Sequence, residues 1–148
     1  MIEVTFEGGT MGVIISIVNQ KGGVGKTTSA VNISAAVGAK AKKEVLVDFD
    51  PQGNATSGYG ISKKNLKTTS YDVVMSNVRP QEAVLATNCK NVSLIPANAQ
   101  LAEAEMHLLQ IEQRNHQLKK ALIQLKDDYY IIIVDCLPSL GILEINAI

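Results

Sequence analysis

Lys21-Gly22-Gly23-Val24-Gly25-Lys26-Thr27-Thr28 is the stretch that decides the fold of this 148-residue chain. An apolar, strand-like run over residues 13–18 precedes it, and a helix-compatible run over residues 29–37 follows it. Glycines let the backbone approach an anion closely, and the N–H groups at the start of the following helix then face that anion. A strand, a glycine-rich loop and a helix in this order predict a phosphate-binding loop.

The side chains of this loop predict separate contacts with a nucleotide. Lys26 is placed to reach the terminal phosphates, and the Thr27 hydroxyl is placed to ligate Mg²⁺. The usual pattern G-x-x-x-x-G-K-[ST] requires a glycine at the position of Gln20, and here a second lysine, Lys21, follows at the mouth of the loop. The alternative is a glycine loop with an incidental solvated lysine. The predicted nucleotide-binding residues are Gly22, Gly23, Val24, Gly25, Lys26, Thr27 and Thr28.

This loop resembles the deviant Walker A motif of the ParA/MinD superfamily of ATPases. The resemblance implies ATP and Mg²⁺ as cofactors and a homodimer that sandwiches the nucleotides. It also implies catalytic roles for Lys26 and for Lys21, which would reach across the dimer to the phosphates bound by the other subunit. Positive charge delivered in this way stabilises the charge that develops on the transferred phosphoryl group.

A second motif covers residues 45–58, where an apolar run ends in Asp48 and Asp50 and a turn follows at Pro51 and Gly53. The run is typical of a buried parallel strand, and ligands in open α/β sheets gather at the carboxyl ends of such strands. The segment is similar to switch I of ParA-type (Soj-like) partition ATPases. By that resemblance Asp50 orients the attacking water and Asp48 supports the magnesium shell. The alternative is a strand-end turn whose carboxylates only cap and bend the chain.

A third motif covers residues 129–141, where a β-branched apolar run ends in Asp135. This is the Walker B form, in which the aspartate holds Mg²⁺, commonly through a water. The residues that follow resemble the family's switch II, except that Leu137 stands where the family usually has a proline. The predicted metal ligands are therefore Thr27, Asp48 and Asp135.

The coarse pattern predicts an α/β P-loop NTPase with a mostly parallel sheet and helices on both faces. We expect strands at 13–18, 45–49, 92–95 and 130–134, a helix from about residue 26, short helices within 54–88, and helical segments over 98–126. Residues 11–148 match the N-terminal portion of a ParA-type domain, and the chain is predicted to be truncated at the C-terminus. Residues 1–10 fit no motif, and we expect a mis-assigned start with Met11 as the true one, or else a disordered or strand-like extension.

Other segments carry weaker predictions. Leucines over 101–125, Leu109 among them, recur at helical spacing and predict an amphipathic helix that covers the sheet. A basic cluster at Lys63, Lys64 and Lys67 is expected to be a solvated surface, with a DNA contact as the alternative. Glu44 stands where the second strand would begin with an apolar residue, and Ala41 where a glycine would permit the helix exit, which puts local stability in doubt.

Composition sets the broad class. The chain is 46% hydrophobic and 19% charged with a formal net charge of zero, which is typical of a soluble globular domain. We expect a cytoplasmic, nucleoid-associated ATPase that acts in chromosome or plasmid partitioning. By resemblance, its partners are a second copy, nonspecific DNA and a stimulating partition protein. The alternatives are a MinD-like membrane-associated positioning switch, a replication-regulating switch, and an inactive fragment of either kind of ATPase.

Overall fold

The structure is a computed structural model that describes residues 2–7, 12–19, 32–34, 42–136 and 146. The predicted phosphate-binding loop, Lys21 to Thr28, lies outside the described residues, as do Met11, Ala41 and Leu137. The motif strands and the two sets of helices that pack on them lie within these ranges.

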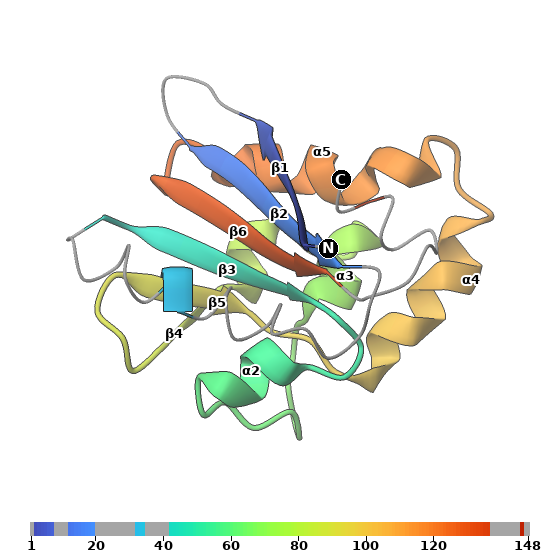
Figure 1. Cartoon of the computed structure of the whole chain (residues 1–148). Coiled ribbons are helices and arrows are strands. Elements are labelled where there is room, and N and C mark those ends of the chain that lie inside the picture. Colours follow the sequence, from blue (N-terminus) through green and yellow to red (C-terminus); the bar gives the residue numbers. More distant parts are fainter. Residues whose placement is uncertain (1, 8–11, 20–31, 35–41, 137–145, 147–148) are drawn as a thin grey trace.

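The core of the molecule is a six-stranded sheet in the order β1-β2-β6-β3-β5-β4 (Figure 1). The four inner strands are parallel, and each edge strand is antiparallel to its neighbour. Parallel strands that are covered on both faces read as continuous apolar runs, which is the pattern of the three motif strands. The strands are β1 Ile2–Glu7, β2 Val13–Asn19, β3 Glu44–Phe49, β4 Leu85–Ala86, β5 Val92–Ile95 and β6 Ile131–Cys136.

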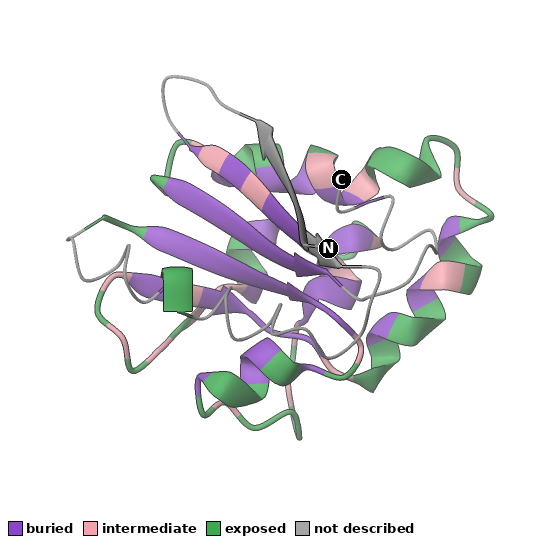
Figure 2. Cartoon of the chain, viewed as in Figure 1, coloured by how far each residue is buried: buried purple, intermediate pink, exposed green. Residues whose placement is uncertain are grey.

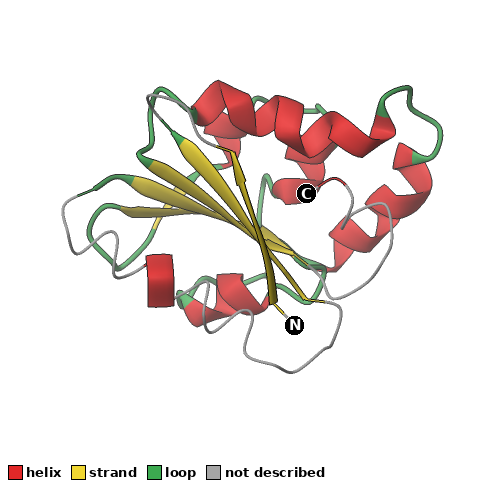
Figure 3. Cartoon of the chain, turned by 45° about the horizontal axis from the view of Figure 1, so that its top comes forward, coloured by secondary structure: helices red, strands yellow, loops and turns green. Residues whose placement is uncertain are grey.

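Helices lie on both faces of this sheet, as predicted (Figure 3). On one face Val47 and Ile132 pack with the apolar sides of the longer helical region, and on the other Leu46 and Ile133 pack near α2. Every residue of β3 and β6 is buried, as Figure 2 shows for the centre of the sheet. The helices and single turns are α2 Asn54–Gly58, α3 Ser70–Val74, η1 Pro80–Ala83, η2 Ala99–Glu103, α4 Ala104–Leu108, η3 Arg114–His116, α5 Gln117–Leu122 and η4 Ile123–Leu125.

The helical region after β5 corrects one prediction. Leu109 was predicted to cover the sheet, but its side chain is 58% exposed, and Leu108 is buried instead. The buried positions Leu101, Ala104 and Leu108 follow helical spacing, which turns Leu109 to the outside. The region is also divided, because Gln113 adopts a left-handed conformation with φ 57° ahead of η3.

Two strands are additional to the four expected ones, although a strand-like N-terminal extension was one alternative. Residues 2–7 form β1, which pairs with β2 from Ile2↔Asn19 to Glu7↔Ile14, so this extension has the strand-like form that was one of the two alternatives. The short β4 escapes prediction because two residues carry no periodicity. Within the described part of the chain, none of the helices has the length and apolar character needed to cross a bilayer.

Candidate functional site: an acidic edge of the sheet

Two aspartates lie side by side where β3 and β6 end. Asp48 of β3 pairs in register with Asp135 of β6, and both side chains are completely buried. Period-two alternation places them on the same face as Leu46 and Ile133. The sequence predicted both residues for one site, and the structure brings them together at the carboxyl edge of the parallel sheet.

The strand that precedes the phosphate-binding loop ends at this same edge. β2 runs parallel to β6, and Ile17 of β2 pairs with Asp135. β2 then ends two residues later, at Asn19. The chain therefore enters the predicted loop next to the two aspartates, while the predicted loop residues Lys21, Lys26 and Thr27 lie outside the described residues.

Thr56 holds the Asp48 carboxylate. Its backbone N–H and its hydroxyl both donate to Asp48 Oδ2, at 2.9 and 2.6 Å. The same hydroxyl oxygen accepts a hydrogen bond from the Ala97 N–H at 3.0 Å, beyond the end of β5. Thr56 is completely buried, so these bonds take the place of water at its N–H and at its hydroxyl. Sequence reasoning gave Thr56 no role, because a threonine eight residues after an aspartate carries no recognisable signal.

The environment of Asp48 favours a bound cation. The pKa of Asp48 is raised to about 7, chiefly by burial; the two hydrogen bonds from Thr56 act against this shift, and the nearby carboxylates of Asp135 and Asp50 add to it. A buried carboxylate whose negative charge is not balanced by protein groups gains stability from a divalent cation. Oxygen donors are also the ligands that Mg²⁺ prefers. The residues present therefore fit a magnesium site.

Carboxylates alone do not complete such a site. Among the described residues, no three His, Cys, Asp or Glu side chains converge closely enough to hold a metal ion. Mg²⁺ usually keeps several waters and takes only one or two carboxylates together with substrate phosphates. A magnesium ion at Asp48 and Asp135 would thus need the Thr27 hydroxyl and phosphate oxygens as further ligands.

Asp50 begins a tight turn beside this pair. Its side-chain Oδ1 accepts from the Gln52 N–H at 2.9 Å, and its carbonyl accepts from the Gly53 N–H at 2.8 Å. Its own N–H points to Asp48 Oδ1 at 3.3 Å. Asp50 is buried, with 6% of its surface exposed, and these hydrogen bonds give its carboxylate a defined orientation at the edge of the sheet.

Gly53 is required at the end of that turn. Its φ is +64°, in the left-handed region, and a Cβ there would lie 2.8 Å from the Ala97 carbonyl oxygen. Any other residue would therefore strain the backbone and displace the chain that leaves β5. The sequence interpretation of Gly53 as a turn residue is confirmed by this geometry.

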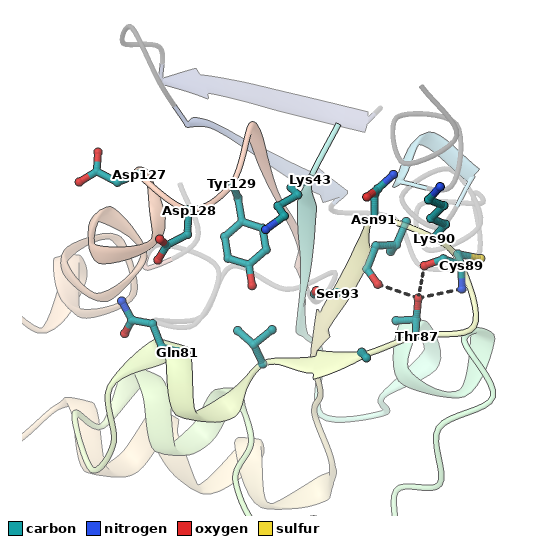
Figure 4. A pocket seen from close by; sticks show the side chains of 13 residues that line it. Lys43, Gln81, Thr87, Cys89, Lys90, Asn91, Ser93, Asp127, Asp128 and Tyr129 are labelled. Carbon is teal, nitrogen blue, oxygen red and sulfur yellow. Dashed lines mark hydrogen bonds between the residues drawn. The ribbon is translucent and has the colours of Figure 1, made fainter. Parts of the chain in front are cut away.

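A pocket lies at the opposite edge of the sheet and contains none of the predicted site residues (Figure 4). It has a volume of about 730 Å³ and is bordered by Lys43, Lys90, Asp127 and Asp128 among others. The Thr87 hydroxyl in its wall is already used, since it lies 2.8 Å from the Val92 carbonyl oxygen. Ligands of open α/β sheets bind at the carboxyl ends of the strands, so the acidic edge and not this pocket is the candidate site.

Comparison with known proteins identifies the family. A protein-family model described as AAA domain matches residues 12–148. The sporulation initiation inhibitor protein Soj of Bacillus subtilis is 49% identical over 138 residues, which cover 93% of this chain and 54% of Soj. The chromosome partitioning protein ParA of Myxococcus xanthus is 43% identical over 139 residues, which cover 94% of this chain and 49% of that protein.

Solved structures share the fold over a similar range. A cobyrinic acid a,c-diamide synthase from Mycobacterium smegmatis, crystallised with ADP and magnesium, superposes with a TM-score of 0.87 at 39% identity, over 94% of this chain and 56% of that one. A plasmid partition protein from Borrelia burgdorferi bound to AMPPNP superposes with a TM-score of 0.79 at 30% identity, over 90% of this chain and 55% of that one. The chain spans about half the length of the curated relatives it matches.

The parallel sheet with its acidic carboxyl edge defines the class as an α/β domain of the P-loop ATPase type. The chain belongs to the AAA domain family, as part of the ParA/MinD superfamily, and it corresponds to the N-terminal portion of the Soj and ParA proteins.

Proposed function

We propose that the protein is an ATP-binding and ATP-hydrolysing switch that acts in chromosome or plasmid partitioning. The observation that carries the proposal is the buried pair of Asp48 and Asp135 on adjacent parallel strands, at the edge where β2 enters the predicted phosphate-binding loop. The name of the relative in M. xanthus, a chromosome partitioning protein, supplies the biological process. The structural relatives alone do not indicate the process, because proteins with different names, a diamide synthase and a plasmid partition protein, share this fold.

In this proposal each predicted residue has a separate task. The backbone of Gly22 to Gly25 and the Lys26 ammonium hold the ATP phosphates, while Thr27, Asp48 and Asp135 hold Mg²⁺. Mg²⁺ supplies positive charge that offsets the charge developing on the transferred phosphoryl group. Asp50 orients the attacking water from its turn at the acidic edge, and Thr56 keeps Asp48 in place.

The proposal extends to assembly and partners. Lys21 of one subunit reaches the phosphates bound by a second copy, so that dimerisation and hydrolysis are coupled. The ATP-bound dimer binds DNA without sequence preference, and a partition partner protein stimulates hydrolysis. Such a protein works in the cytoplasm on the nucleoid.

The test is steady-state ATP hydrolysis by the full-length protein with and without nonspecific DNA, beside Lys21→Ala and Asp50→Ala. We expect DNA together with the partner protein to stimulate turnover, and both substitutions to lower hydrolysis by about 100-fold or more, because each removes a group used in the transition state. Binding of a fluorescent ATP analogue is expected to survive Asp50→Ala, since Asp50 does not hold the phosphates.

Other outcomes would change the assignment. Turnover that ignores DNA but responds to anionic lipid vesicles would favour the membrane-associated positioning switch instead. Hydrolysis that is unaffected by Asp50→Ala would remove Asp50 from the mechanism. A protein that binds no nucleotide at all would contradict the proposal as a whole.

A further inference from the structure

Lys63 folds back over the turn that follows Asp50. Its Nζ donates a hydrogen bond of 2.6 Å to the Gln52 carbonyl oxygen. Its aliphatic stem lies against Gly53, where the Lys63 Cδ occupies the space that a Cβ would take, 2.5 Å from its position. The prediction that this lysine is only solvated is therefore incomplete, although its side chain borders solvent.

The contact acts on one particular peptide group. The Gln52 carbonyl and the Gly53 N–H belong to the same planar unit. The N–H side donates to the Asp50 carbonyl at 2.8 Å, and the carbonyl side accepts from Lys63. This peptide plane is thus held from both sides, and its orientation closes the turn in which Asp50 Oδ1 accepts from the Gln52 N–H.

Glycine makes such a restraint necessary. A peptide plane that precedes glycine rotates easily, because glycine populates positive and negative φ about equally. Rotation of the Gln52–Gly53 plane would break the Gly53 N–H bond to the Asp50 carbonyl and loosen the turn. Lys63 can donate to the Gln52 carbonyl only in the present orientation of the plane, so this hydrogen bond disfavours the rotation.

We propose that Lys63 is a positioning residue that holds the Asp50 turn in its catalytic arrangement through the Gln52 carbonyl. The inference deepens the proposed function and rests on it, because it assumes that Asp50 orients the attacking water. In this proposal Lys63 acts through the peptide plane and not by contact with the nucleotide or the reacting atoms. Among the described contacts, the neighbouring exposed Lys64 has no side-chain hydrogen bond to this turn, which makes it a matched control.

The experiment compares Lys63→Met, Lys63→Arg and Lys64→Met in the full-length protein. Methionine keeps the stem that covers Gly53 but removes the ammonium, and arginine restores a cationic donor. We expect Lys63→Met to lower kcat for ATP hydrolysis about tenfold with KM changed less than about twofold, because misplaced catalytic groups cost turnover and the phosphates are bound elsewhere. Lys63→Arg should recover most of the loss, and Lys64→Met should match the wild type.

A second measurement reports on the stability of the turn and does not depend on ATP hydrolysis. Amide hydrogen exchange at Gly53, measured by NMR, should be about tenfold faster in Lys63→Met than in wild type or Lys64→Met, because local opening sets that rate. If the wild-type protein hydrolyses no ATP, the proposed function fails, and this exchange rate still decides whether Lys63 holds the turn. Equal Gly53 exchange in all variants, or an unchanged kcat in Lys63→Met, overturns the inference.

Discussion

Thr56 joins the ends of two strands at a single buried hydroxyl. The hydroxyl donates to Asp48 at the end of β3 and accepts from the Ala97 N–H after β5, so two segments far apart in the sequence depend on it. Because a buried polar group that loses its partner bears its full desolvation cost, this residue contributes to folding as well as to the proposed magnesium site.

Replacing Thr56 with valine tests that role. Valine keeps the shape but leaves the Ala97 N–H without its acceptor, so we expect the free energy of unfolding to fall by about 2 kcal/mol. Urea unfolding of Thr56→Val beside Thr56→Ser, which retains the hydroxyl, measures the loss. The exposed neighbour Ser57→Ala serves as the control, and a Thr56→Val protein as stable as that control would contradict the argument.

At the scale of single residues, the sequence could predict the acidic pair but not what holds it. Asp48 and Asp135 follow apolar runs whose parallel pairing brings strand ends together, and that pairing is confirmed. Thr56 and Lys63 could not be assigned, because their roles arise from loops that return to the turn only in three dimensions. The assignments of Lys21, Lys26 and Thr27 stay predictions, since these residues lie outside the described part of the chain.

Among the elements, α3 shows how a helix of five residues is stabilised. Isolated helices of this length are not stable in water, so the caps and the packing must supply the difference. The Thr69 hydroxyl accepts from the Tyr71 N–H at 3.2 Å, and the Asp72 carboxylate accepts from the Thr69 N–H at 3.0 Å, which together form a capping box. Tyr71 then packs in the core and its hydroxyl meets His107 Nδ1 of α4 at 2.9 Å.

Loss of this cap should destabilise the helical layer. Thr69→Ala removes the hydroxyl from the first turn of α3, and we expect it to lower the free energy of unfolding by about 1 kcal/mol. Thr69→Ser keeps the capping oxygen and should stay within about half of that loss. Thermal unfolding followed by circular dichroism distinguishes the two, and an equal loss in both variants would assign the effect to the threonine methyl group instead.

Long elements with an apolar pattern could be predicted from the sequence, whereas short elements and those defined by tertiary pairing could not. The inner strands β2, β3, β5 and β6 were predicted because each carries a mostly apolar run, and their ends shift by no more than two residues. The helical region could be predicted as helical segments but not where it is divided, since the left-handed Gln113 has no signal in the sequence. The strand β1 was expected only as one alternative, a strand-like extension, because its pairing with β2 is a tertiary event.

Across the whole molecule, the opposite ends of β3 carry buried acids. Glu44 at the start of the strand is completely buried, and neither carboxylate oxygen has a hydrogen-bond partner among the described residues. Burial raises the pKa of Glu44 to about 8, so the protonated acid is the stable form near neutral pH. An acidic residue at this position therefore does reduce local stability when it is ionised. The strand is most stable when Glu44 carries its proton.

The sign of the pH dependence follows from that shift. The folded-state pKa of Glu44 is raised above its ordinary value of 4.5, so its stabilising contribution is complete below about pH 4.5 and is lost as the pH rises to about 8. Through that window one proton changes the free energy of unfolding by at most about 1.4 kcal/mol per pH unit. Glu44→Gln removes the ionisation, so the variant should become steadily more stable than the wild type between pH 5 and 8. Urea unfolding at pH 5, 6.5 and 8, with the exposed Glu103→Gln as control, measures the difference, and parallel pH profiles for wild type and Glu44→Gln would show that Glu44 ionises in the fold without cost.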